Sequence, residues 1–374
     1  MVNLYNHLQA LEQGNWFKLI CGASYKFLPA VRNLTLVYTL AGADCIDIAA
    51  DPAVVASARR GLEVARNFTV LSQEQGFNEN QIPPLLMVSL NDGEDPHFRK
   101  AKFDPDMCPS NCTGPCERIC PSQAIILNTR QGLVYKENKI EEFSAGIIPE
   151  KCYGCGRCLS VCSHGLIHTS SYLSRLEMII PLILSSGINA IEIHTQVGNL
   201  LEFRRLWNKI TPWVEQLELV AISCPDGKGV IEYLKSLCTE VMPLPCALVW
   251  QTDGRPMSGD IGKGTTMAAV KFGKKVLTAQ LPGYVQLAGG TNNYTVPKLK
   301  DMGLLYKENS QSYISGVGYG SYARMLLSPI LEKLENKEMN ITGMSAKNHL
   351  EEEPKLLWEA VCLASSLVSQ IKSL

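Results

Sequence analysis

The chain has 374 residues, 46% of them hydrophobic, and a formal net charge of −1 at pH 7. This length allows one large domain and a small one, and the neutral balance without a basic, aromatic-rich stripe excludes a typical nucleic-acid-binding protein. The longest apolar stretch, residues 178–188, is shorter than the roughly 20 residues that span a bilayer. Because no secretory signal opens the chain, we expect a cytoplasmic protein with no transmembrane segment.

Short apolar runs alternate with amphipathic stretches along most of the chain. Asp51 and Pro52 predict a helix start, with the acid as cap and proline at the first position, and the helical spacing continues to residue 68. Residues 200–213 and 229–238 have the same spacing. The strands that we predict are residues 17–22, 44–49, 85–89, 190–194, 217–223, 247–250, 284–288 and 313–316.

Strands that alternate with helices indicate βαβ units and a parallel sheet. Eight of them favour an α/β fold of the (β/α)8 TIM-barrel type, and an open doubly wound sheet is the alternative. We predict a discontinuous barrel over residues 1–92 and 170–344, an α+β two-cluster ferredoxin-like insertion over 93–169, and a C-terminal helical extension over 345–374. The insertion would follow the third strand and so lie over the barrel mouth, where active sites of such barrels are found.

Eight of the fourteen cysteines occur in two runs. The runs are Cys108, Cys112, Cys116 and Cys120, and Cys152, Cys155, Cys158 and Cys162. The second run has the spacing of a bacterial ferredoxin half-motif, and the first ends with the Cys-Pro of that motif. A disulfide framework would require an oxidising compartment, and zinc sites usually pair two Cys-x2-Cys knuckles. The runs therefore predict two iron–sulfur clusters.

Crossed ligation follows from the two-cluster pattern, in which the fourth cysteine of each run reaches the other cluster. Cluster B would take three cysteines of the second run and Cys120, and cluster A would take Cys162 and sulfurs of the first run. The first run is stretched to three intervening residues at each step, as in seven-iron ferredoxins. Cluster A is therefore 4Fe–4S, or 3Fe–4S with Cys108 or Cys112 free.

Glycine-rich turns after the predicted seventh and eighth strands suggest a ligand site at the barrel mouth. Barrels often bind phosphate with these two loops, although ordinary tight turns would have the same composition. The loop after the sixth strand adds two cations. The candidate residues for a flavin or another phosphate-bearing ligand are Gly289, Gly290, Thr291, Gly316, Gly318, Gly320, Arg255 and Lys263. No clear catalytic acid–base set is visible, and Cys224 is the best candidate nucleophile.

Two segments resemble one particular family. The run Cys108-Pro-Ser-Asn-Cys112-Thr-Gly-Pro-Cys116-Glu-Arg-Ile-Cys120-Pro121 and the segment Asp253-Gly-Arg-Pro-Met-Ser-Gly-Asp-Ile-Gly262 are similar to the light-dependent period (LdpA) family of cyanobacteria. The resemblance runs over essentially the whole chain. It implies a cytoplasmic iron–sulfur protein in the input path of the circadian clock, with clock proteins as partners, and it implies that all eight cysteines are cluster cysteines.

Three functions are compatible with these features. The first is a redox-sensing or electron-transfer protein that reports cellular redox state, and so light, and that exchanges electrons with a redox carrier. The second is a barrel oxidoreductase whose clusters feed electrons to a bound flavin. The third is a structural role, in which the clusters only hold the insertion folded.

Overall fold

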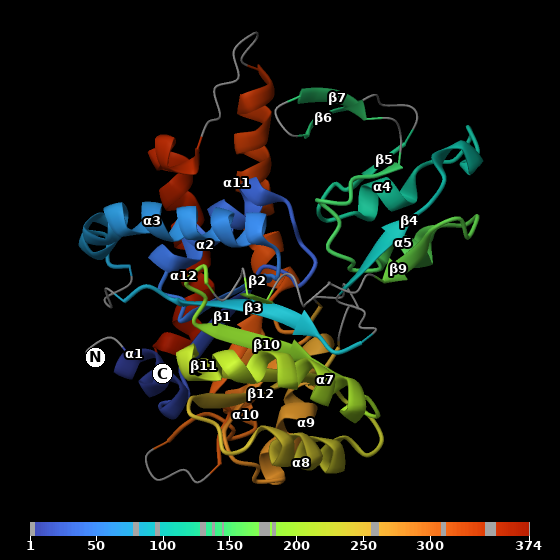
Figure 1. Ribbon diagram of the computed structural model, residues 1–374. Coiled ribbons are helices and arrows are strands. Elements are labelled where there is room, and N and C mark those ends of the chain that lie inside the picture. Colours follow the sequence, from blue (N-terminus) through green and yellow to red (C-terminus); the bar gives the residue numbers. More distant parts are fainter. Residues whose placement is uncertain are drawn as a thin grey trace.

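The computed structural model describes residues 4–77, 82–93, 98–127, 132–136, 139–143, 146–171, 180–181, 185–255, 262–307, 312–340 and 349–373. Eight parallel strands form a closed barrel in the order β1-β14-β13-β12-β11-β10-β3-β2 (Figure 1). The predicted TIM-barrel-like α/β fold is confirmed, and the open sheet is excluded. The strands are β1 (Trp16–Ile20), β2 (Cys45–Ala49), β3 (Leu85–Asn91), β10 (Ala190–His194), β11 (Leu219–Pro225), β12 (Ala247–Asp253), β13 (Tyr284–Ala288) and β14 (Gly316–Tyr319).

Strand β14 begins where the predicted eighth strand ends. Gly316 and Gly318 therefore lie inside the strand, and only Gly320 follows it. Gly316 pairs with Trp16 of β1, and a Cβ atom at Gly316 would lie 2.5 Å from the Trp16 ring. The glycine is required because the tryptophan fills the space that a side chain would occupy.

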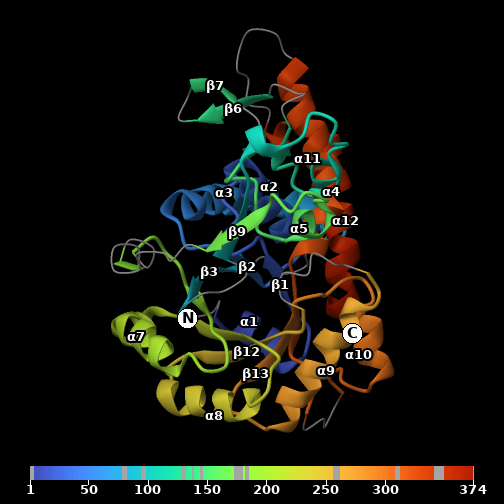
Figure 2. The same cartoon turned by 90° about the vertical axis from the view of Figure 1, so that its right-hand side faces the viewer.

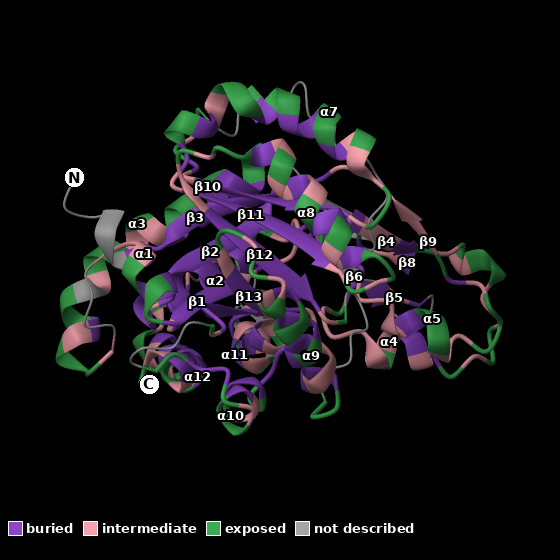
Figure 3. Ribbon diagram, turned by 90° about the horizontal axis from the view of Figure 1, so that it is seen from below, coloured by how far each residue is buried: buried purple, intermediate pink, exposed green. Residues whose placement is uncertain are grey.

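Helices surround the barrel, and their polar faces are exposed while the strands are buried (Figure 3). In helix α3 the Asp51 carboxylate accepts a hydrogen bond of 2.9 Å from the Ala53 N–H, which confirms the predicted helix start. Helix α7 ends at Ile210, and a 3-10 turn carries the chain past Pro212, which has no N–H for a helical bond. The helices around the barrel, α3 and α7 included, are α1 (Leu4–Glu12), α2 (Leu28–Leu40), α3 (Pro52–Glu74), α7 (Leu200–Ile210), η3 (Thr211–Gln216), α8 (Val230–Val241), α9 (Thr265–Thr278), α10 (Thr295–Asp301) and α11 (Ser321–Asn340).

The C-terminal helix α12 (Pro354–Lys372), preceded by the turn η4 (Leu350–Glu352), packs against α2, α11 and β1. Figure 2 shows α11 and α12 side by side along one flank of the molecule. Leu357, Val361, Val368 and Ile371 of α12 are fully or almost fully buried in the main core. This helix therefore completes the core of the barrel. No helix in the described ranges has the length and apolar character to cross a membrane.

Between β3 and β10 the chain leaves the barrel, and its described residues there form small two-stranded sheets and short helices (Figure 1). The sheets pair β4 with β9, β5 with β8 and β6 with β7, all antiparallel. A separate apolar cluster, which includes Ala124, Ile125, Leu127 and Ile167, holds this segment together. Its elements are β4 (Arg99–Lys102), η2 (Pro105–Met107), α4 (Pro115–Ile119), β5 (Ile125–Ile126), β6 (Gly132–Lys136), β7 (Lys139–Phe143), β8 (Gly146–Ile147), α5 (Arg157–Val161) and β9 (His168–Ser171).

Candidate functional site

Four cysteines, drawn from both runs, line one small cavity in the segment between β3 and β10, hereafter the inserted segment. The cavity is lined by Cys108, Cys112, Cys116 and Cys162, together with residues such as His164. Burial, and then the neighbouring Cys112, Cys116 and Cys162 thiols, raise the pKa of Cys108. The set combines three thiols of the first run with the last thiol of the second. These are the residues that crossed ligation assigns to cluster A.

The other four cysteines form a second group. Burial, and then the thiols of Cys155, Cys152 and Cys120, raise the pKa of Cys158 to about 12. Burial also raises the pKa of Cys155, and Cys120 and Cys152 again lie among its neighbours. This group joins three thiols of the second run to the last thiol of the first, which is the set assigned to cluster B.

The two runs adopt the same local structure, as an internal repeat would. Helix α4 follows Gly114 and carries Cys116, and helix α5 follows Gly156 and carries Cys158. Both glycines have positive φ, 66° and 76°, which lets the chain turn sharply into each helix. Each helix ends at the last cysteine of its run, Cys120 or Cys162, and the short helices contact each other.

Backbone N–H groups surround the last cysteine of each run. The Ala124 N–H donates to the Cys120 sulfur at 3.3 Å. Burial would raise the pKa of the Cys162 thiol, but the backbone N–H groups of residues 164–167 outweigh burial and lower that pKa. Donors aimed at a sulfur favour its thiolate form, which is the form that binds iron. Hydrogen bonds to cluster sulfurs are also one of the features that set a reduction potential.

The chemistry of these residues fits iron–sulfur clusters. Each group supplies four thiols, the number that a 4Fe–4S cluster takes. Cys116, Cys152 and Cys158 are buried, and the other five cysteines are half-buried. In the described ranges no group of three or more Cys, His, Asp and Glu side chains is arranged around a single metal ion. Ligands of a cluster bind different irons, so they lie further apart than ligands of one ion.

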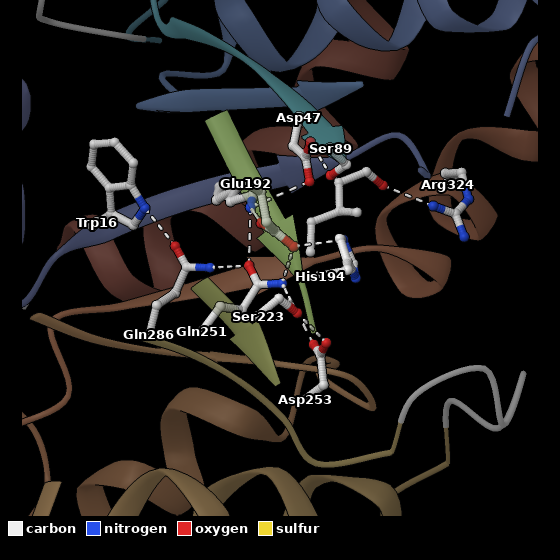
Figure 4. A network of polar contacts seen from close by, with 12 residues as sticks. Trp16, Asp47, Ser89, Glu192, His194, Ser223, Gln251, Asp253, Gln286 and Arg324 are labelled. Atoms are coloured by element: carbon white, nitrogen blue, oxygen red, sulfur yellow. Dashed lines mark hydrogen bonds and ion pairs between the residues drawn. The ribbon is translucent and has the colours of Figure 1, made fainter. Parts of the chain in front are cut away.

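The interior of the barrel has an apolar half and a polar half. Trp16, Cys45, Met87, Ala190 and Val249 form an apolar cluster near the start of the strands. Towards the strand ends the buried inner side chains are polar, and Figure 4 shows how they converge on one another. They are Lys18, Asp47, Ser89, Glu192, His194, Ser223, Gln251, Asp253 and Gln286.

Lys18 is at the centre of this polar layer and is completely buried. Its ammonium forms an ion pair with Glu192, lies 3.3 Å from Asp47 and donates to Gln251 at 2.9 Å. Burial opposes ionisation, but the carboxylates of Asp47 and Glu192 raise the pKa of Lys18. Glu192 and Gln251 accept hydrogen bonds from the ammonium, and the Asp47 carboxylate adds a second negative charge beside it. The free amine that a nucleophilic lysine requires is therefore not available in this arrangement.

The layer continues from Glu192 towards the barrel mouth. The Nε2 atom of His194 lies 2.9 Å from Glu192, and the edge of the Phe98 ring contacts the histidine with ring centres 5.4 Å apart. Although burial pushes the pKa of Glu192 upward, Lys18 and His194 lower it to about 2. Phe98 belongs to the inserted segment, so this polar layer reaches the base of that segment.

Asp47 makes the stability of the barrel depend on pH. Burial raises the pKa of Asp47 to about 6 from 3.8. The carboxyl has a lower pKa in the unfolded chain than in the folded one, so a rising pH deprotonates the unfolded chain first and favours it. The unfolding free energy should therefore fall as pH rises from 4 to 7, by about 3 kcal/mol at most. Asp47→Asn should flatten the fall in denaturant unfolding of the holo protein. Parallel curves for the two proteins over this pH range would contradict the assignment.

The predicted ligand residues at the mouth are only partly brought together. Gly290 accepts a hydrogen bond from the Thr265 hydroxyl, and the Thr291 hydroxyl donates to the Gly318 carbonyl at 2.6 Å, which joins the loop after β13 to strand β14. The Arg255 N–H donates to the Gly289 carbonyl at 2.8 Å. Lys263 instead lies over the ring of Tyr294, 5.5 Å from its centre. Residues 256–261 of the same predicted loop lie outside the described residues.

The polar layer is a functional feature that the sequence analysis does not predict. It treats the strands as apolar runs, yet β10 alternates strictly: Ile191 and Ile193 pack in the main core, while Glu192 and His194 face inward. Alternation of this kind separates the two faces of a strand, and it is the signal that could have located the layer. Cys224, the candidate nucleophile, lies in β11 and is buried in the main core.

The chain is similar to known proteins over most of its length. Residues 108–173 match a family described as the LdpA Fe-S cluster-binding domain, and residues 182–370 match the Light dependent period A C-terminal domain. A protein of Synechococcus elongatus called Light dependent period A is 47% identical over 365 residues, which cover 98% of this chain and 93% of that protein. The alignment with the crystal structure of fructose-bisphosphate aldolase from Campylobacter jejuni covers 96% of this chain and 90% of the aldolase chain, at 7% sequence identity and a TM-score of 0.33.

Proposed function

Because the chain belongs to the Light dependent period A family and contains its iron–sulfur-binding domain, we propose that it is a redox sensor of the circadian input path. It would carry two clusters and report the redox state of the cytoplasm, and so light, to clock proteins. The segregation of eight cysteines into two groups of four, each drawn from both runs, is the observation that supports two clusters. Residues 93–169 would be the ferredoxin-like module that holds them.

The two groups of four cysteines assign the proposed ligands of the two clusters. Cluster A would bind Cys108, Cys112, Cys116 and Cys162, which makes a 4Fe–4S cluster the preferred type over 3Fe–4S. Cluster B would bind Cys120, Cys152, Cys155 and Cys158. When bound, such clusters accept and release single electrons. The chain would bring the thiols together and direct backbone N–H groups at the sulfurs of Cys120 and Cys162, and iron would displace the proton of each thiol that is protonated.

Sensing requires that the fold responds to the redox state of the clusters. We expect hydrogen exchange, measured by mass spectrometry on the holo protein, to differ between samples poised oxidised and reduced by mediators. The differences should fall in the inserted segment and in the barrel loops beneath it, and they should reverse on re-oxidation. Identical exchange in the two states would leave the clusters a structural role and would refute the sensor.

A second candidate function is an oxidoreductase with a phosphate-bearing ligand, such as a flavin, at the barrel mouth. The hydrogen bond that holds the loop after β13 against β14 favours it, because many barrels bind phosphate with the loops that follow these two strands. Arg255→Met and Lys263→Met should each weaken binding of inorganic phosphate or flavin mononucleotide, measured by calorimetry, by about tenfold for one lost charged hydrogen bond. Lys333→Met, on the exposed side of α11, is the control. Absence of binding in the unaltered protein would exclude this function.

A further inference from the structure

The two cysteine groups differ in how they meet the barrel. The segment just before and within the second run lies against the barrel: the Lys26 N–H donates to the Glu150 carbonyl at 3.3 Å, and the Lys151 ammonium lies 3.2 Å from Glu335 of α11. Tyr153 packs on the main core of the barrel, whereas its neighbour Cys152 belongs to the core of the inserted segment. The cavity of the first group is lined by residues of the inserted segment itself. Cluster B is therefore the one that faces the barrel.

Arg324, at the start of α11, connects this contact to strand β1. Its Nη1 donates to the carbonyl oxygens of Ile20 and Cys21 at 2.8 and 2.9 Å, where β1 ends. Its Nη2 donates to the Ser321 hydroxyl at 3.1 Å. The planar guanidinium lies over the ring of Tyr153, 4.1 Å from its centre, an arrangement that lysine cannot reproduce. Figure 4 shows Arg324 reaching the strand end beside the polar layer.

The position of Tyr153 brings this cation close to cluster B. Tyr153 follows Cys152 directly and precedes Cys155 by two residues. The contacts that the structure gives Arg324 within the described ranges are to carbonyl groups, a hydroxyl and the ring of Tyr153, and none is to a carboxylate. Its positive charge is therefore not offset by an ion pair there. A cation near a cluster stabilises the more negative, reduced form.

We propose that Arg324 is the positioning residue that couples the charge of cluster B to the end of β1 and to the loop at residues 21–27. This inference rests on the proposed function. Reduction adds one electron, supplied by a one-electron carrier or mediator, and no bond is made or broken. If Arg324 favours the reduced form, reduction must tighten the Arg324 contacts by the same free energy. Residues 20–27 should then be held more firmly in the reduced protein.

Anaerobic redox titration of the full-length holo protein, followed by EPR, tests the inference. Arg324→Gln should lower the midpoint of cluster B and leave that of cluster A unchanged, and the redox dependence of hydrogen exchange at residues 20–27 should disappear. Arg324→Lys keeps the charge but loses the planar fork, so the midpoint should move less while the exchange response is still lost. Lys333→Gln removes a charge further along the same helix, where Lys333 pairs with Glu359, and should change neither quantity.

The outcomes separate this inference from the proposed function. If the unaltered protein titrates and responds in exchange, but both Arg324 variants behave in the same way, the coupling role of Arg324 is wrong and the sensor stands. If the unaltered protein shows no redox-dependent exchange, the sensor itself is refuted. Should Arg324→Gln fail to fold, Arg324→Lys alone decides, because an unchanged exchange response in that variant overturns the inference.

Discussion

A chain in which serine replaces Cys155 is expected to lose the iron of one cluster and to keep that of the other. Cys155 lies in the second group, with Cys120, Cys152 and Cys158, so the loss should be about four iron atoms per chain, whichever type cluster A is. Serine has nearly the same shape but is a poor ligand for iron. Iron and acid-labile sulfide assays on anaerobically purified protein, together with EPR of the reduced sample, measure the effect.

The control for this experiment is Cys362→Ser, because Cys362 is exposed on α12 and lies outside both runs. Its iron content should equal that of the unaltered protein. Limited proteolysis adds a second readout, since loss of cluster B should expose the inserted segment while the barrel persists. An unchanged iron content in the Cys155 variant would show that this cysteine is not a ligand, and the division into two groups would have to be abandoned.

Replacement of Lys18 by methionine is expected to lower the free energy of unfolding by about 3–5 kcal/mol. The methionine fills a similar volume, but Asp47 and Glu192 are then buried without their cation. Both carboxyls would take up protons more readily, so the variant should be least stable at neutral pH and should recover as pH falls. Denaturant unfolding of the holo protein, followed by tryptophan fluorescence, measures the difference.

Two further variants make the result for Lys18 specific. Lys235→Met removes an exposed lysine that pairs with Glu232 on α8, and its effect should stay below about 1 kcal/mol. Addition of Glu192→Gln to Lys18→Met removes one of the stranded charges and should restore part of the lost stability. A Lys18 variant as stable as the unaltered protein at pH 7 would show that the charges of the polar layer are not coupled in this way.

The barrel could be predicted from the sequence because its signal is local. Buried strands such as β2 and β10 alternate with helices whose starts are marked, as at Asp51 and Pro52, and each feature depends on neighbouring residues. Strand β14 was misplaced for a physical reason. Its two glycines resemble a turn, and only the approach of Trp16 from β1 explains why a strand requires them.

The cysteine groups were predictable from spacing, whereas contacts between distant segments were not. The short steps, three residues throughout the first run and two, two and three in the second, indicate which thiols share a loop, and ferredoxin logic supplies the exchange of Cys120 and Cys162. Nothing near Arg324 in the sequence indicates that it contacts Ile20 and Tyr153. The packing of α12 against α2 is equally non-local: the sequence predicts a helical extension over residues 345–374 and does not indicate which helix it contacts.

The most direct test of the sensor is an anaerobic redox titration of the purified protein, followed by EPR and absorbance, with an assay for flavin among the released small molecules. We predict reversible cluster signals with at least one midpoint inside the cytosolic range of about −220 to −320 mV, and no stoichiometric flavin. Clusters that stay in one oxidation state across that range would contradict the account and leave them a structural role. Stoichiometric flavin would favour the oxidoreductase.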